Sequence, residues 1–125
     1  MSAFFIYGTF MRGQPGHANL EGARFLEHVE TAPRYRLWEI DGRWPALIED
    51  EEGVAIAGQL WEVEEPHLAR LAEIEPPGWA RAEVGLGDGR RVDAFLGEPI
   101  LRPRGRDVSG YCGWAAYAAS GERGS

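Results

Sequence analysis

Turn-forming residues are spread along the whole chain, and they limit its fold more than any other feature. The 125 residues include 17 glycines and 8 prolines, together one residue in five. Glycine and proline weaken or break helices and strands, so regular elements end after a short run. The sequence therefore predicts short strands joined by many loops.

Two β-hairpins are predicted where runs of strand-forming residues flank a glycine turn. Residues 34–40 alternate between two faces and are followed by Asp41-Gly42, a strong hairpin signal. Residues 44–48 form the returning strand. The second predicted hairpin has strands at residues 79–86 and 91–96 and a turn at residues 87–89.

The remaining segments complete an α+β pattern. Pro66 after two glutamates predicts the start of a helix over residues 65–75, and Pro76-Pro77 ends it. Further strands are predicted at residues 3–7, 24–29 and 54–63, loops at 8–16 and after 98, and a short helix or packed segment at 113–119. We predict a single α+β domain over residues 1–120, built as a small mixed or antiparallel β-barrel, and a flexible tail at residues 121–125.

Composition and charge narrow the classes of function. Apolar residues make up 44% and charged residues 26% of the chain, values typical of globular proteins. The net charge of −7 argues against a nucleic-acid binder, which needs a basic surface. The longest stretch of low charge, residues 111–119, is far shorter than the roughly 18 residues of a membrane span. We therefore expect no nucleic-acid or membrane partner. The single cysteine, Cys112, cannot form an internal disulfide, so we expect a cytoplasmic protein.

The histidines, the single cysteine and an acidic turn do not predict a chemical site. The three histidines lack the spacing of metal ligands, and we expect neither a metal nor an organic cofactor. Cys112 is interpreted as a small buried hydrophobe rather than a nucleophile. Residues 49–53 are interpreted as a solvated turn rather than a cation site, because their spacing fits no calcium loop.

The segment Tyr7-Gly8-Thr9-Phe10 lies where the first predicted strand opens into a glycine loop. Successive main-chain N–H groups in such a loop can form a concave nest that binds a carboxylate or a phosphate. The P-loop pattern is not met, because no lysine follows Gly13. On the pattern alone, a nest and a plain turn both stay open.

Glu75 is the carboxylate that the helix pattern directs toward apolar surroundings. Positions 68, 71, 72 and 75 share one helix face, and the first three are leucine or alanine. A carboxylate buried without partners is costly, so such a residue is usually protonated, paired or functional. Two structural alternatives stay open: Pro76 frays the last turn and rotates Glu75 outward, or Glu75 forms an ion pair with Arg81.

The loop and the helix-end glutamate occur together in a known family. The sequence resembles the γ-glutamylcyclotransferase-like proteins over nearly the whole chain, with the motifs in the same order. The matching segments are Tyr7-Gly8-Thr9-Phe10 with Gly13, Trp44-Pro45-Ala46-Leu47, residues 54–63, Leu71-Ala72-Glu73-Ile74-Glu75 followed by Arg81, and residues 110–117. Phe10, Ala72 and Trp79 depart from the family pattern, and these changes bear on substrate identity more than on reaction type.

One branch of this family is closer in sequence. Residues 31–37, 87–90, 95–98 and 113–117 resemble the C-terminal domain of allophanate hydrolase, which has the same fold and is attached to an amidase. This chain keeps the intact loop and the helix-end glutamate. Both features favour a cyclotransferase-like site over an inert domain.

The resemblance implies a small β-barrel with flanking helices and a pocket at one end. The implied substrate is a small γ-glutamyl amide, whose α-amine attacks its own γ-carbonyl to form 5-oxoproline and release an amine. Because both reacting groups belong to one molecule, proximity supplies much of the rate. Glu75 is the predicted general acid/base. The predicted substrate-binding residues are Tyr7, Gly8, Thr9, Phe10, Gly13 and Arg81.

Other functions stay open. The chain is alternatively a non-catalytic accessory domain that forms a homodimer or assembles with an amidase, with its five tryptophans available for an interface. We favour Trp44, Trp61 and Trp79 as core or pocket lining. As a third reading, the same pocket processes a carbamoyl compound of urea metabolism. The sequence does not identify the leaving amine.

Overall fold

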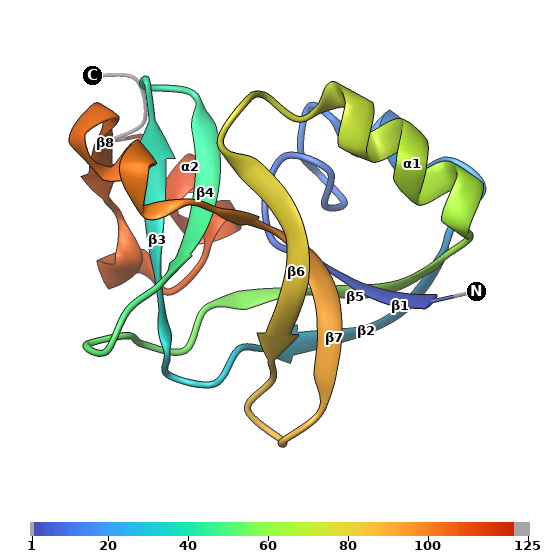
Figure 1. Ribbon diagram of the computed structural model, residues 1–125, viewed down its shortest axis with the longest axis horizontal. Helices are drawn as coiled ribbons and strands as arrows, with labels where there is room; N and C mark the ends of the chain where they lie inside the picture. The colour runs from blue at the N-terminus through green and yellow to red at the C-terminus, as the bar shows by residue number, and fades with distance from the viewer. Residues whose placement is uncertain (1, 122–125) are drawn as a thin grey trace.

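Two β-sheets with a few short helices make up the protein. The computed structural model describes residues 2–121 (Figure 1). The strands are β1 (Ser2–Ile6), β2 (Arg24–Glu30), β3 (Tyr35–Ile40), β4 (Trp44–Glu49), β5 (Ala57–Val63), β6 (Trp79–Gly85), β7 (Arg91–Gly97) and β8 (Gly105–Asp107). The helices are α1 (Glu65–Ile74) and α2 (Trp114–Ala119), with 3₁₀ turns η1 (His17–Leu20), η2 (Pro99–Arg104) and η3 (Ser109–Tyr111).

Strand β1 lies at the centre of the larger sheet. This sheet has the order β2-β5-β1-β7-β6, with β1 antiparallel to β5 and parallel to β7. Phe4, Phe5 and Ile6 are all buried, as expected for a central strand that is covered on both faces. The loop that follows β1 therefore starts in the interior, beside α1 (Figure 1).

The α+β class is confirmed, but residues 2–121 do not form the predicted closed barrel. Strands β3, β4 and β8 form a separate sheet of order β4-β3-β8. The edge strands β2 and β6 of the larger sheet meet only just beyond their ends, at an isolated bridge between Thr31 and Leu86. A barrel needs continuous pairing around its circumference, and one bridge does not provide it.

Both predicted hairpins are confirmed. In the β3–β4 hairpin, Ile40 pairs with Trp44, and the turn residues Asp41 and Gly42 have φ of 54° and 71°. The Arg43 N–H donates to Ile40 O at 3.0 Å, which closes a β-turn with Asp41 and Gly42 as its two central residues. Positive φ at both central residues is what a type I′ turn requires, and glycine reaches it without steric cost. The β6–β7 hairpin pairs all seven residues of each strand.

Three predicted segments differ in detail. Strand β5 begins at Ala57 rather than at residue 54, because Val54 instead forms an isolated bridge with Tyr35. Helix α1 ends one residue early, at Ile74. The segment after residue 98, predicted as a loop, contains η2 and the short strand β8. Residues 122–125 of the predicted tail lie outside the described part of the chain.

The core has two parts. The main cluster packs the larger sheet against α1, through Leu68 and Leu71, and against α2, through Trp114 and Tyr117. Trp61, one of the tryptophans expected inside, belongs to this cluster. A smaller cluster of Ile40, Ala46, Ile48 and Leu101 lies under the β3–β4 hairpin, with Trp38, Trp44 and Trp79 packed against it. Within residues 2–121, no helix is both long and apolar enough to cross a membrane.

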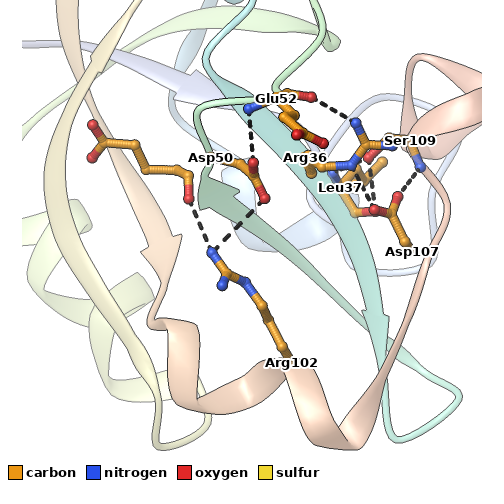
Figure 2. Close-up of polar contacts among 8 residues, drawn as sticks. Arg36, Leu37, Asp50, Glu52, Arg102, Asp107 and Ser109 are labelled. Carbon is orange, nitrogen blue, oxygen red and sulfur yellow. Dashed lines mark hydrogen bonds and ion pairs between the residues drawn. The ribbon is translucent and has the colours of Figure 1, made fainter.

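The acidic turn after β4 is held by arginines (Figure 2). The Arg102 guanidinium lies 3.9 Å from the Asp50 carboxylate, and Arg36 Nη1 donates to the Glu52 main-chain oxygen at 2.7 Å. Asp50 also accepts a hydrogen bond from the Glu52 main-chain N–H at 2.8 Å. The described residues contain no group of three or more His, Cys, Asp or Glu side chains that could hold a metal ion.

Candidate active site

A cavity of about 60 Å³ opens where β1 ends. Its walls come from segments far apart in the sequence: the end of β1 and its loop, the start of β4, the end of α1, the start of β6, and β7. The lining residues are Phe5, Ile6, Tyr7, Gly8, Thr9, Phe10, Trp44, Pro45, Ile74, Glu75, Pro76, Trp79 and Phe95. Among these residues, Glu75 is the one Asp, Glu, Lys, Arg or His.

Glu75 reaches the cavity from the point where α1 ends. Its backbone is extended, with φ −65° and ψ 135°, so the residue follows the helix instead of completing its last turn. Pro76 explains this, because a proline disfavours the helical conformation of the residue before it. The chain thus leaves the helix early, as one alternative expected, and the Glu75 side chain nevertheless lines the cavity.

Burial changes the acidity of Glu75. The loss of water around the carboxylate raises its pKa to about 7. The alternative ion pair with Arg81 is not formed: the Arg81 guanidinium binds Glu65 and Asp93, each at 2.8 Å, on the outer surface. A carboxyl group with a pKa near neutrality can both accept and return a proton at physiological pH.

The loop after β1 presents unused main-chain donors. Within residues 2–121, the N–H groups of Gly8, Thr9 and Phe10 donate no hydrogen bond. The loop is held by other groups, since Met11 N donates to Gly8 O at 3.1 Å and Gly16 N donates to Thr9 O at 2.8 Å. Unpaired donors at a buried or half-buried position are costly without a ligand or water, so these three N–H groups are available to a ligand.

Gly8 is required by close packing. A Cβ atom at this position would collide with the Pro45 ring. The loop therefore lies directly against the start of β4, and the cavity wall depends on a residue without a side chain. Gly13, predicted to act with this loop, does not line the cavity; its φ of +82° suits a turn farther along.

Tyr7 holds the cavity walls together. Its hydroxyl donates to the Phe95 main-chain oxygen at 2.7 Å and accepts from the Leu47 N–H at 3.1 Å. Burial, followed by the nearby charge of Glu75, raises the pKa of Tyr7 well above its usual range, so the hydroxyl stays neutral. Both bonds join the end of β1 to β4 and β7.

The structure therefore brings together Tyr7, Gly8, Thr9, Phe10 and Glu75, and it leaves Gly13 and Arg81 outside the lining. Trp44 and Trp79 line the cavity, as one of the two readings of these tryptophans expected. Sequence reasoning did not single out Pro45, Pro76 or Phe95. Their signals were weak: Pro45 belongs to a family-like segment, and Pro76 adjoins Glu75.

The interpretation of Cys112 is wrong. The residue is exposed rather than buried, and it occupies a left-handed position with φ of 58° at the end of η3. A residue at such a helix end often adopts the left-handed conformation, and here it lies at the surface. Cys112 is not among the residues that line the cavity.

Comparison with known sequences gives two related likenesses. The family described as the allophanate hydrolase C-terminal domain matches residues 2–119. A Vibrio cholerae protein named "Putative gamma-glutamylcyclotransferase" is 35% identical over 71 residues, which span 57% of this chain and 59% of that protein. A Pyrococcus horikoshii protein with the same kind of name is 29% identical over 109 residues, 82% of this chain and 83% of that protein.

Solved structures with a similar fold include both kinds of relative and one further protein. A uropathogenic E. coli-specific protein is 30% identical, with a TM-score of 0.89 over 95% of this chain and 96% of that one. Allophanate hydrolase of Kluyveromyces lactis is 20% identical, with a TM-score of 0.87 over 94% of this chain and 21% of that one, which shows a shared fold. An aig2-like mouse protein is 25% identical, with a TM-score of 0.65 over 81% of this chain and 82% of that one.

Proposed function

This chain belongs to the allophanate hydrolase C-terminal domain family, and from that premise we propose that it is a γ-glutamylcyclotransferase-like enzyme. Its substrate is a small γ-glutamyl amide, and its products are 5-oxoproline and a free amine. The names of the relatives from Vibrio cholerae and Pyrococcus horikoshii support this reaction class. The observation that carries the proposal is the shared cavity of Glu75 and the Gly8 loop.

The proposed reaction uses few protein groups. The N–H groups of Gly8, Thr9 and Phe10 bind the substrate α-carboxylate and fix the position of the α-amine. Glu75 removes a proton from the α-ammonium, and the free amine attacks the γ-carbonyl carbon. The bond from this carbon to the leaving nitrogen then breaks as Glu75 returns its proton to that nitrogen, which gives the free amine. The attacking nitrogen loses its second proton to water and becomes the lactam nitrogen.

The pKa of Glu75 suits both halves of this cycle. A carboxylate with an ordinary pKa would be a weak base toward an ammonium, and its acid form would be scarce at neutral pH. With a pKa of about 7, both forms of Glu75 are populated near neutrality. The apolar lining that raises the pKa also limits the water near the reacting carbonyl.

The test is Glu75→Gln, assayed by formation of 5-oxoproline from γ-glutamyl amides. Loss of a general acid/base typically lowers the rate by about 10²–10⁴-fold. Glu73→Gln is the matched control, because Glu73 is exposed and lies two residues away on α1. Equal turnover by both variants, with intact folding by circular dichroism, rejects Glu75 as the catalytic group.

A second candidate rests on the family match itself. The matched family is named for a domain of allophanate hydrolase, and the Kluyveromyces lactis enzyme carries this fold within a much longer chain. In that case the chain is a non-catalytic accessory domain. Calorimetric titration with glutamate and 5-oxoproline separates the two, since an accessory domain gives no saturable heat with either compound.

A further inference from the structure

We propose that the leaving amine carries an apolar substituent, an alkyl or aryl group, rather than a charged one. This inference rests on the proposed function and adds the class of amine that the cavity accepts. It follows from the composition of the cavity lining, which has a few polar groups that can bind the glutamyl group and is otherwise mostly apolar side chains.

The glutamyl group uses the polar side. Within the lining, the donors of the Gly8 loop, the Thr9 hydroxyl and the Glu75 carboxylate have no hydrogen-bond partner among residues 2–121. An amino-acid head group has one carboxylate and one ammonium to place, and these groups match it. They leave no further ionic partner in the lining for a second charged group.

Two other polar side chains of the lining, Trp79 and Tyr7, are already engaged. Trp79 Nε1 donates to the Pro45 main-chain oxygen at 2.9 Å. The Tyr7 hydroxyl has both a donor bond, to Phe95 O, and an acceptor bond, from Leu47 N. A substrate that recruited either group would have to break a bond within the cavity wall, which costs free energy.

Carbon surface forms the rest of the wall. Trp44, Pro76 and Trp79 are half-buried, and all three line the cavity. Ile74 is 52% exposed, one of two large hydrophobic side chains with such exposure among the described residues, and it also lines the cavity. An exposed isoleucine beside two tryptophans gives an apolar ligand surface to cover.

A carboxylate on the leaving amine would meet an unfavourable environment. It would lose water against these apolar side chains and approach the Glu75 carboxylate, which carries the same charge. Arg43 is a cation next to the lining: its guanidinium lies 4.3 Å from the centre of the Trp44 ring, but Arg43 itself does not line the cavity. An assay with an anionic amide therefore tests whether the leaving group finds a cationic partner outside the lining.

The experiment measures kcat/KM of the unsubstituted protein for three substrates: γ-glutamylbenzylamide, γ-glutamylglycine and γ-glutamyl-ε-lysine. Benzylamine and glycine are amines of similar basicity, so their ratio reports the cavity rather than the leaving ability. We expect the benzylamide to be preferred about tenfold or more, since burying an aromatic ring readily supplies the roughly 1.4 kcal/mol that a factor of ten needs. Equal or higher kcat/KM for the glycine or lysine amide overturns the inference and leaves the proposed function intact.

Turnover of none of the three amides removes the proposed function, and the inference with it. A pair of variants locates the preference in the cavity. Ile74→Gln should lower the benzylamide-to-glycine ratio about fivefold, because it replaces carbon surface at the cavity with an amide. Ile100→Gln is the matched control, since Ile100 is 75% exposed and lies outside the lining. An unchanged ratio in Ile74→Gln contradicts an apolar site at this position.

Discussion

Two carboxylates in this protein show what a partner does to a buried charge. Glu75 lines the cavity, and burial raises its pKa to about 7. Asp107 ends β8, and burial also acts to raise its pKa, but hydrogen bonds from Ser109 and Arg36 outweigh that effect and lower it. Hydrogen-bond donors thus compensate for the burial of Asp107, whereas Glu75 has no such donors among residues 2–121.

The contacts explain the difference. Asp107 accepts from Arg36 Nε at 2.6 Å and from the Ser109 N–H at 2.9 Å (Figure 2). Glu75 has apolar neighbours and no hydrogen-bond donor within residues 2–121. Unpaired, partly buried carboxyl groups in cavities are typical of catalytic acids and bases, whereas paired ones usually stabilise structure. We therefore expect changes at the two positions to have opposite consequences.

The largest expected effect is on catalysis. Glu75→Gln and Asp107→Asn each remove one carboxylate charge and keep the side-chain shape. We expect kcat to fall about 10²–10⁴-fold in the first and less than about twofold in the second, because only Glu75 lies beside the proposed substrate. Initial rates of 5-oxoproline formation give both values. Similar losses in the two variants would mean that charge or folding in general, and not a proton transfer at Glu75, limits the reaction.

The pH dependence sharpens the same contrast. Because Glu75 acts first as a base, its ionised form is the active one in the free enzyme, and its pKa is about 7. We expect kcat/KM to rise about tenfold per pH unit below that value and to level off above it. Asp107→Asn should keep this profile. A profile that levels off near pH 4–5 would assign the reaction to a carboxylate of ordinary acidity.

The sequence predicts most of the strands and helices that hold the two carboxylates. It predicts only part of how these elements pack together. Asp41-Gly42 and residues 87–89 predicted both hairpins, because positive φ at glycine is a local property that needs no tertiary information. The helix-face argument for Glu75 holds only in part: Leu68 and Leu71 are buried, but Ala72 is exposed and Glu75 lies beyond the last helical residue. Strand β8 was missed, since three residues beside prolines carry too little pattern to show a strand.

The cavity forms only when segments far apart in the sequence pack together. Pro45, Trp79 and Phe95 come from three strands, and no local pattern indicates that they meet beside the Gly8 loop. Arg81 follows the helix in the family-like order, yet it forms ion pairs on the outer surface, because Glu65 and Asp93 lie within its reach. Order along the chain therefore predicted the elements of the site better than it predicted their contacts.

Stability should respond to Glu75 in the direction opposite to activity. The folded-state pKa is raised, so the folded protein holds the proton more tightly than the unfolded chain. Stability is then full below about pH 4.5 and is lost as the pH rises toward 7. Glu75→Gln removes this loss, and we expect it to raise the free energy of unfolding by about 2 kcal/mol at pH 8, after allowance for the partial exposure of the side chain.

Urea unfolding followed by tryptophan fluorescence at pH 8 and pH 4 measures this gain. The two proteins should have equal stability at pH 4, where both positions are uncharged. Glu73→Gln should change little at either pH, since Glu73 is exposed. A Glu75→Gln variant that is less stable at pH 8 would indicate a favourable partner for the ionised carboxylate.

The smallest expected effect is at Asp107. There, removal of the carboxylate lowers the free energy of unfolding, whereas at Glu75 it raises it. The folded-state pKa is lowered, so the stabilisation is present above the unfolded value of about 3.9 and is lost as the pH falls through the lower folded value. Asp107→Asn should lower the free energy of unfolding by about 1 kcal/mol at pH 7, a modest loss because the Asp107 and Arg36 side chains are 30% and 29% exposed and water can solvate the arginine that remains.

The loss at Asp107 should shrink as the pH falls below the unfolded value of about 3.9, measured by the same urea unfolding, while the gain at Glu75 grows toward pH 8. High salt distinguishes the two further. It should weaken the exposed Arg36–Asp107 pair and leave the effect of burial on Glu75 almost unchanged. If both variants changed stability in the same direction at pH 7, the two carboxylates would have similar environments. The contrast between a paired Asp107 and an unpaired Glu75 would then be wrong.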